Sequence, residues 1–136
     1  MGTIVRWYSV NLVIFISVPL EVYLSCLKFL GGPSTNELQY VRVPAITTTQ
    51  CKEAYPDGSG AHDITDSMFC AGYPGVGGKD ACSGDSGGPF VCNVNNKAVI
   101  AGIVSWGKGC AEAKYPGVYA RVTKILDWIK DNMVAN

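Results

Sequence analysis

The segment with the clearest chemical potential is residues 84–89, which read Gly-Asp-Ser-Gly-Gly-Pro. A serine hydroxyl is a weak nucleophile, so it needs a base to take its proton and amide donors for the oxyanion that develops on the attacked carbonyl. Gly84 has no β-carbon, so a substrate can approach its N–H closely. The segment therefore predicts acyl transfer, with Ser86 as the nucleophile. A tight turn rich in Gly and Asp is the alternative.

Two other interpretations of the glycine-rich segments fail on their context. The nucleophile elbow of α/β-hydrolases needs a strand before the serine and a helix after it. Here Pro89 follows the serine, residues 90–94 alternate like a strand, and a loop rich in Gly and Cys comes before. Residues 75–79 lack the spacing of a phosphate-binding loop, and Asp80 replaces the Ser or Thr that such a loop requires. The sequence excludes both.

The neighbours of Ser86 indicate a family. Phe-Cys-Ala-Gly at 69–72, the serine segment, Gly-Ile-Val-Ser-Trp-Gly at 102–107 and Tyr-Pro-Gly-Val-Tyr at 115–119 follow one another. In order and approximate spacing they resemble the trypsin and chymotrypsin family of serine endopeptidases, from about Leu38 to near the C-terminus. The resemblance implies an all-β fold. Residues 31–136 would form an antiparallel Greek-key β-barrel, the second barrel of the chymotrypsin-like fold, with a C-terminal α-helix.

The resemblance also implies the roles of individual residues. Ser86 is the nucleophile, and the amides of Gly84 and Ser86 form the oxyanion hole. Ser105, Trp106 and Gly107 form the edge strand that pairs with the substrate backbone. These positions predict peptide-bond hydrolysis.

Asp80 is expected at the floor of the primary specificity pocket. A buried carboxylate is costly unless it is paired, so Asp80 would favour substrates that carry lysine or arginine. Gly107 and Gly117 would leave the pocket open. The alternative is a solvated turn carboxylate after residues 77–79, Gly-Gly-Lys.

The general-base histidine and its orienting aspartate lie, in the family, before the part that corresponds to Leu38. His62 is the single histidine of this sequence, in a polar, turn-rich segment at 57–63. We interpret it as exposed and non-catalytic, although triad order varies between folds. Asp85 pairs, in the family, with the N-terminal amine that zymogen cleavage releases. No Ile-Val-Gly-Gly segment precedes it here, so we expect another partner or an inactive oxyanion loop.

Two classes of function follow. The first is a trypsin-like serine endopeptidase that cuts after Lys or Arg only when His and Asp come from a preceding segment or a partner chain. The chain alone would then be nearly inactive, because removing a triad member leaves only about 10³ to 10⁴-fold acceleration over water. The second is a non-catalytic binding module that holds basic side chains over Asp80 or engages a protease inhibitor.

The cysteine pattern predicts disulfide bonds. The chain has 6 cysteines, with no Cys-x-x-Cys pair and no nearby histidines. Zinc is therefore a poor interpretation, and we expect neither a metal nor a cofactor. Disulfide bonds indicate an oxidising compartment, hence a secreted protein. The residues alone leave the pairing open. The resemblance implies Cys51–Cys70 and Cys82–Cys110, with Cys26 as the candidate partner of Cys92.

The net charge and the N-terminal segment bear on whether the chain binds nucleic acid or a membrane. With 11 basic and 11 acidic residues, the chain has no electrostatic case for nucleic acid or an anionic membrane. Residues 1–30 are mostly apolar after Arg6. They resemble a signal peptide in part, but the apolar run is short for a membrane span. We favour a barrel strand from Val22 to Phe29, or non-native sequence in a fragment of a longer enzyme.

The elements that must position these residues are mostly strands. Residues 38–46, 89–94, 98–106 and 117–122 are rich in β-branched and aromatic residues. A short helix is expected over 48–54, entered from a threonine cap. Thr123 is expected to cap a C-terminal helix whose apolar residues, with Trp128, pack on the barrel.

Overall fold

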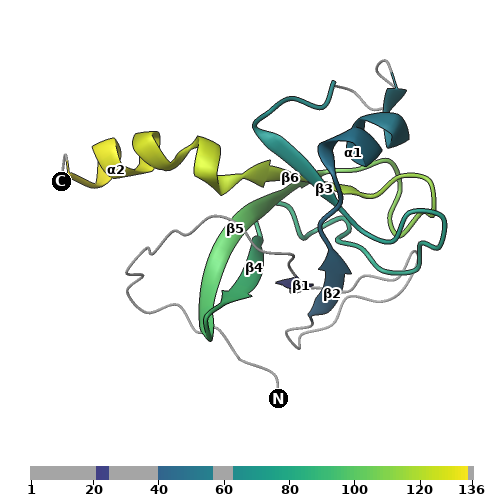
Figure 1. Cartoon of the computed structure of the whole chain (residues 1–136), viewed down its shortest axis with the longest axis horizontal. Helices are drawn as coiled ribbons and strands as arrows, with labels where there is room; N and C mark the ends of the chain where they lie inside the picture. Colours follow the sequence, from purple (N-terminus) through teal and green to yellow (C-terminus); the bar gives the residue numbers. More distant parts are fainter. Residues whose placement is uncertain (1–20, 25–39, 57–62, 135–136) are drawn as a thin grey trace.

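A computed structural model describes residues 21–24, 40–56 and 63–134 of this protein (Figure 1). No helix within these ranges is long and apolar enough to cross a membrane. The elements are β1 (Glu21–Leu24), β2 (Val41–Pro44), α1 (Thr48–Ala54), β3 (Met68–Ala71), β4 (Pro89–Val94), β5 (Lys97–Trp106), β6 (Gly117–Arg121), the 3-10 turn η2 (Val122–Lys124) and α2 (Leu126–Val134).

The strands form one antiparallel sheet that closes on itself. Its order is β2-β1-β4-β5-β6-β3, so β2 and β3 lie at its two ends. An antiparallel bridge between Ala45 and Ala71 joins these ends. The Ile46 N–H donates to the Cys70 carbonyl at 3.0 Å, and the Gly72 N–H donates to the Pro44 carbonyl at 2.9 Å. The expected all-β, antiparallel fold with a C-terminal helix is therefore confirmed.

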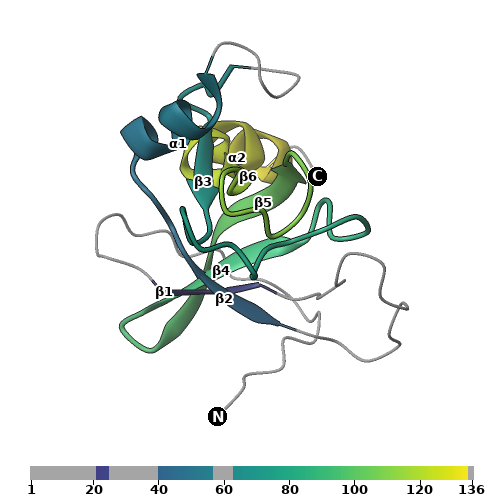
Figure 2. The same cartoon turned by 90° about the vertical axis from the view of Figure 1, so that its right-hand side faces the viewer.

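The strands predicted over 89–94, 98–106 and 117–122 agree closely with the observed elements. The strand predicted over 38–46 is shorter in the described residues, where β2 covers Val41–Pro44, and β3 was not among the predicted strands. β4 begins and ends as expected, β5 begins one residue earlier than predicted and β6 ends one residue earlier. Asn95 and Asn96 connect β4 to β5 with φ of 50° and 61°, as a two-residue hairpin turn requires. Figure 2 shows the long β5 strand passing from β4 to β6. This strand carries at its end Ser105 and Trp106, which the sequence predicts to pair with the substrate backbone.

Glu21–Leu24 forms strand β1, which pairs with both β2 and β4. A barrel strand beginning at Val22 was one interpretation of this region. Residues 1–20 and 25–39 lie outside the described residues. The nature of the N-terminal segment as a whole therefore stays a prediction.

Three aromatic rings fill the centre of the sheet. Phe69 on β3 contacts Phe90 on β4 edge-on, with ring centroids 4.9 Å apart, and stacks on Tyr119 of β6 at 5.4 Å. Gly102 on β5 lies under Phe69, and a β-carbon there would come within 2.6 Å of the ring. Glycine at this position allows the ring to approach the strand. Rings from three strands therefore hold the sheet together.

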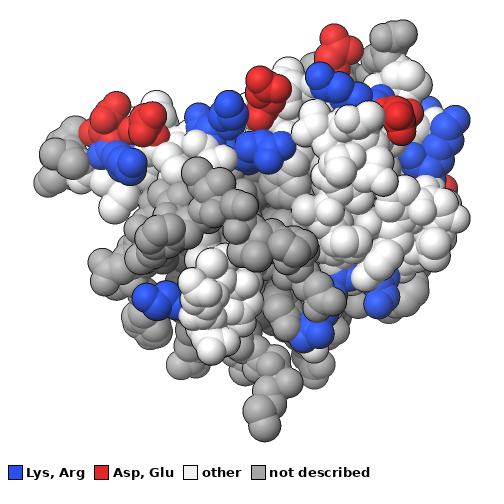
Figure 3. All heavy atoms as spheres, in the orientation of Figure 1, with Lys and Arg blue, Asp and Glu red and all other residues white. Residues whose placement is uncertain are grey.

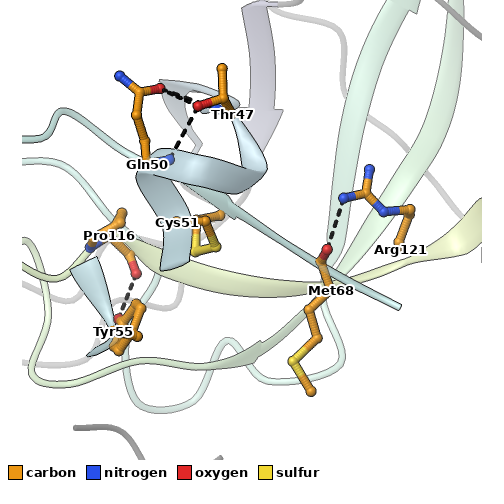
Figure 4. The surroundings of a disulfide bond; sticks show 8 residues. Thr47, Gln50, Cys51, Tyr55, Met68, Pro116 and Arg121 are labelled. Carbon is orange, nitrogen blue, oxygen red and sulfur yellow. Dashed lines mark hydrogen bonds between the residues drawn. A yellow bond between two sulfur atoms is a disulfide. The ribbon is translucent and has the colours of Figure 1, made fainter. Parts of the chain in front are cut away.

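A second cluster lies under α1. Thr47 caps this helix: its hydroxyl accepts the Gln50 N–H at 3.2 Å, and the Gln50 side chain accepts the Thr47 N–H at 3.1 Å. The expected helix over 48–54 with a threonine cap is thus present. A disulfide bond from Cys51 to Cys70 fixes the helix to β3, with Cα atoms 5.5 Å apart (Figure 4).

The C-terminal helix differs from expectation in its start and its packing. Thr123 lies inside the turn η2 and caps no helix, and α2 begins only at Leu126. Trp128 was expected to pack on the barrel, but its side chain is 66% exposed. The physical reason is the direction of α2, which projects away from the described sheet in Figure 1. Its spacing of apolar residues is typical of a packed helix, but the described strands do not cover Trp128.

The aromatic core makes a stability prediction. Phe90→Ala removes a ring that is 1% exposed, and we expect it to lower the free energy of unfolding by about 3–5 kcal/mol. Trp128→Ala is the matched control and should cost no more than about 0.5 kcal/mol, because its ring is in solvent. Urea unfolding of the full chain, followed by circular dichroism, measures both. Equal losses would contradict this assignment of the core.

Candidate active site

A cavity of about 150 Å³ opens beside the serine segment. Its walls come from the loop between β3 and β4, from the end of β5 and from the start of β6. The site residues predicted from sequence that line it are Asp80, Ser86, Ser105, Trp106, Gly107 and Gly117. Segments that are distant in the sequence therefore meet at one pocket. Gly84 and Asp85 are not among its lining residues.

The carboxyl group of Asp80 is buried in this pocket, with 7% of the residue exposed. Oδ1 accepts the Ala81 N–H at 2.8 Å, and Oδ2 accepts the Ala111 N–H at 3.1 Å. Burial raises the pKa of Asp80 to about 6, and the two amide hydrogen bonds limit the rise. The alternative of a solvated turn carboxylate is therefore wrong.

Gly117 and Tyr119 of β6 flank this carboxylate. A β-carbon at Gly117 would overlap Asp80 Oδ1, so glycine keeps the space beside the carboxylate open. The Tyr119 hydroxyl is buried, and it has no hydrogen-bond partner in the part of the chain described. Burial also raises the pKa of this phenol, which keeps it neutral.

Sequence reasoning missed the Ala111 amide and Tyr119. Tyr119 alternates with Gly117 along β6, and this spacing could have placed both side chains on one face. A backbone N–H such as that of Ala111 has no side-chain signal.

The turn that carries Ser86 is fastened to β5. The Gly87 N–H donates to the Val104 carbonyl, and the Val104 N–H donates to the Gly88 carbonyl, each at 2.9 Å. Gly84 and Gly87 have φ of 101° and 82°, in the left-handed region that favours glycine. Ser86 is exposed. The turn thus presents its hydroxyl at the pocket.

Asp85 lies buried behind this turn. Its Oδ2 accepts the Cys82 N–H at 2.8 Å. Its Oδ1 is buried and finds no hydrogen-bond partner among the described residues. The sequence left the partner of Asp85 open. The Cys82 amide is a partner for only one of its two carboxylate oxygens.

β4 does not accompany β5 to its end. The pairing of β5 with β4 ends at Ile103, and its pairing with β6 shifts register between Val104 and Trp106. Ser105 lies at this irregularity and is exposed. A strand edge can pair with an extended peptide where no other strand covers it. No strand of the described residues pairs with Ser105 on the side where β4 ends, so this position has the geometry of such an edge.

Disulfide bonds hold the pocket walls. A bond from Cys82 to Cys110 links the Ser86 loop to the loop after β5, with Cα atoms 5.4 Å apart. This pair and Cys51–Cys70 are those that the resemblance implied. Cys92 is a buried free thiol, and burial raises its pKa to about 11. Its proposed partner, Cys26, lies outside the described residues, so that bond stays a prediction.

The described residues contain no histidine that could act as the general base, and His62, the single histidine of the sequence, lies outside them. Its expected surface position is therefore untested. Within the described ranges, no group of three or more His, Cys, Asp or Glu side chains could hold a metal ion. The groups assembled here are a hydroxyl, a buried carboxylate and an open strand edge.

Comparisons with known proteins give one consistent result. A family model described as Trypsin matches residues 26–129. Trypsin-1 of Astacus astacus is 50% identical over 104 residues, which cover 76% of this chain and 42% of that protein. Trypsin Blo t 3 of Blomia tropicalis is 55% identical over 95 residues, 70% of this chain and 34% of that protein. Putative trypsin-6 of Homo sapiens is 48% identical over 106 residues, 78% of this chain and 39% of that protein. The chain spans less than half the length of these relatives.

The pKa of Asp80 predicts how the pocket binds a cation. Its carboxyl is ionised above pH about 6, so we expect p-aminobenzamidine to bind best at neutral pH. Its affinity should fall as the pH drops through 6, approaching tenfold per pH unit as the carboxyl takes up a proton. Fluorescence titration of the ligand between pH 5 and 8 measures this.

Two variants control that titration. Asp80→Asn should bind weakly at every pH, because it has no charge to titrate. Asp66→Asn removes an exposed carboxylate and should behave like the unchanged protein. A flat profile for the unchanged protein would show that Asp80 does not bind the amidine.

Proposed function

Because the chain belongs to the trypsin family of serine proteases, we propose that it supplies the nucleophile and the specificity pocket of an endopeptidase that cleaves after lysine or arginine. The observation that carries this proposal is the placement of Asp80 and Ser86 in one pocket. A buried carboxylate held by only two neutral amide donors is completed by a cationic side chain. That side chain brings its own carbonyl group toward the serine.

The proposed reaction is acyl transfer to Ser86. Oγ forms a bond to the carbonyl carbon of the residue held over Asp80, and the carbonyl π electrons move to its oxygen. The N–H groups of Gly84 and Ser86 have no acceptor among the described residues, which leaves them free to bind that oxyanion. The serine proton goes to a base, which returns it to the amine nitrogen as the C–N bond breaks and the carbonyl re-forms. Water then adds to the acyl-serine ester, which releases the carboxylic acid and restores the Ser86 hydroxyl.

We propose that this base and its orienting aspartate come from residues outside the described part or from another chain. His62 lies in a polar, turn-rich segment, whereas the base of the family comes before the part that corresponds to Leu38. Without a base, the pocket and the amides alone leave only about 10³ to 10⁴-fold acceleration over water. This chain by itself should therefore hydrolyse amides at a negligible rate.

Asp85 fits a role in activation. Its Oδ1 is buried and lacks a partner in the described residues, so a positively charged group could bind there. On the family resemblance, that group is a newly released N-terminal amine. The two disulfide bonds agree with a secreted protein, because such bonds persist in oxidising compartments.

A second candidate function is binding without catalysis. The pocket that holds a cation is complete within the described residues, whereas the base is absent from them. Such a module would hold a basic side chain, or the basic residue of a protease inhibitor, over Asp80.

Ser86 is tested in the oxidised full chain with an arginine amide substrate and a fluorophosphonate probe. Ser86→Ala removes the nucleophile, and Ser83→Ala is the matched control from the same loop. We expect no turnover above background in any of the three proteins, and p-aminobenzamidine binding in all of them. Labelling that requires Ser86 but not Ser83 supports the protease.

Other results have different meanings. Turnover that depends on Ser86 would show that the chain contains its own base and would contradict our view of His62. No labelling together with p-aminobenzamidine binding favours the binding module. Failure to bind p-aminobenzamidine by a folded chain contradicts both functions.

A further inference from the structure

A row of aromatic rings leads away from Trp106, at the end of β5. The Trp106 ring contacts Tyr55 edge-on, with centroids 5.0 Å apart. Tyr55 in turn lies 5.7 Å from Tyr115. The Tyr55 hydroxyl donates to the Pro116 carbonyl at 2.7 Å (Figure 4). This row connects the proposed substrate edge to the rim of the pocket and fixes the position of Tyr115.

Two lysines gather around Tyr115. Lys108 Nζ lies 4.5 Å from the ring centroid and donates to the phenol oxygen at 3.2 Å. Lys114 Nζ lies 5.5 Å from the same centroid. The hydrogen bond from Lys108 and the charges of both lysines lower the pKa of Tyr115. The ring therefore orders a local concentration of positive charge.

No carboxylate of the described residues neutralises these lysines. The ion pair found in those residues joins Lys130 to Asp127, on α2. Glu112 belongs to the same loop as the lysines, yet it forms no ion pair with either of them. Both lysines are exposed. In Figure 3, basic and acidic side chains both lie at the right-hand edge of the molecule, where Figure 1 draws the loop from β5 to β6.

Lys108 lies directly on the expected path of a substrate. Its neighbours Gly107 and Gly109 both line the pocket. A peptide paired antiparallel to the edge runs against the direction of β5. If its basic residue lies opposite Ser105, its earlier residues pass Trp106 and Gly107 in turn. The residue three positions before the basic residue then lies opposite Lys108.

We propose that Lys108, supported by Lys114, selects substrates that carry an acidic side chain three positions before the cleaved lysine or arginine. This inference rests on the proposed function, because it uses the same substrate direction and the same pocket. The Lys108 ammonium has three donors and uses one on Tyr115, so two remain for a carboxylate. Asp80 and Lys108 would thus recognise opposite charges on one peptide.

The expected effect is modest, because both lysines are in solvent. Exposed ion pairs of this kind correspond to about a twofold to fivefold change in affinity. The effect should shrink toward nothing in 0.5 M NaCl, where the screening length falls to about 4 Å. The size of the preference for the acidic peptide therefore distinguishes an exposed contact at Lys108 from the buried contact at Asp80.

The test compares acetyl-Asp-Ala-Ala-Arg-amide with acetyl-Asn-Ala-Ala-Arg-amide, which differ in one charge at the selected position. Each peptide displaces p-aminobenzamidine from the full, oxidised chain at low salt, and fluorescence gives the two affinities. The Asp peptide should bind about twofold to fivefold more tightly than the Asn peptide. Lys108→Gln should reduce this ratio, and Lys108→Glu should bring it below one.

Lys97→Gln is the matched control, because Lys97 is exposed at the opposite end of β5. It should keep the ratio of the unchanged protein. Equal binding of the two peptides, or an unchanged ratio in Lys108→Gln, overturns the inference. In that case p-aminobenzamidine binding shows that the pocket itself is intact. If p-aminobenzamidine itself does not bind, the proposed function fails and this inference fails with it.

Discussion

The buried carboxylate of Asp80 is the constraint on which the rest of the site depends. A charge removed from water must be compensated, and the protein does so in part with backbone N–H groups. One N–H comes from the next residue, Ala81, and the other from Ala111, which is 31 residues away. These bonds require the two loops to meet, and the Cys82–Cys110 bond holds them together. In the proposed function, the remaining need for positive charge makes the pocket selective.

The barrel positions those loops. The bridge from Ala45 to Ala71 closes the sheet, and the rings of Phe69, Phe90 and Tyr119 fill its interior. Because β5 is packed on this core, its far end projects beyond the last residue that β4 pairs with, Ile103. The same strand fastens the Ser86 turn through Val104. One element therefore places the proposed nucleophile, the pocket wall and the proposed substrate edge.

In the proposed function, substrate recognition and bond cleavage depend on different parts of the protein. The described residues assemble a cation pocket, an exposed serine and an aromatic row that ends at two lysines. All of these depend on one barrel. Proton transfer needs a base that the described residues do not contain. A trypsin-family barrel of this kind can therefore contain all the residues of the proposed substrate specificity. The proposed reaction still needs a base from another segment.

The sequence by itself determined what depends on local pattern. The motif around Ser86, strand β4, most of β5 and the helix over 48–54 are visible there, because turn residues, alternation and capping act between near neighbours. The family follows from the order of its blocks. The capping role of Thr123 was wrong, since the chain makes a 3-10 turn there before α2 begins.

Only the tertiary structure decided which groups are buried and which meet. A glycine-rich segment such as 77–80 is equally compatible with a solvated or a buried Asp80, and burial depends on the distant loop that covers it. The helical spacing around Trp128 is equally compatible with a packed or an exposed ring, and the direction of α2 decided the matter. The contact of Lys108 with Tyr115 likewise requires a loop to fold back on itself. Local sequence preferences set the elements, whereas desolvation and long-range contacts depend on how those elements pack.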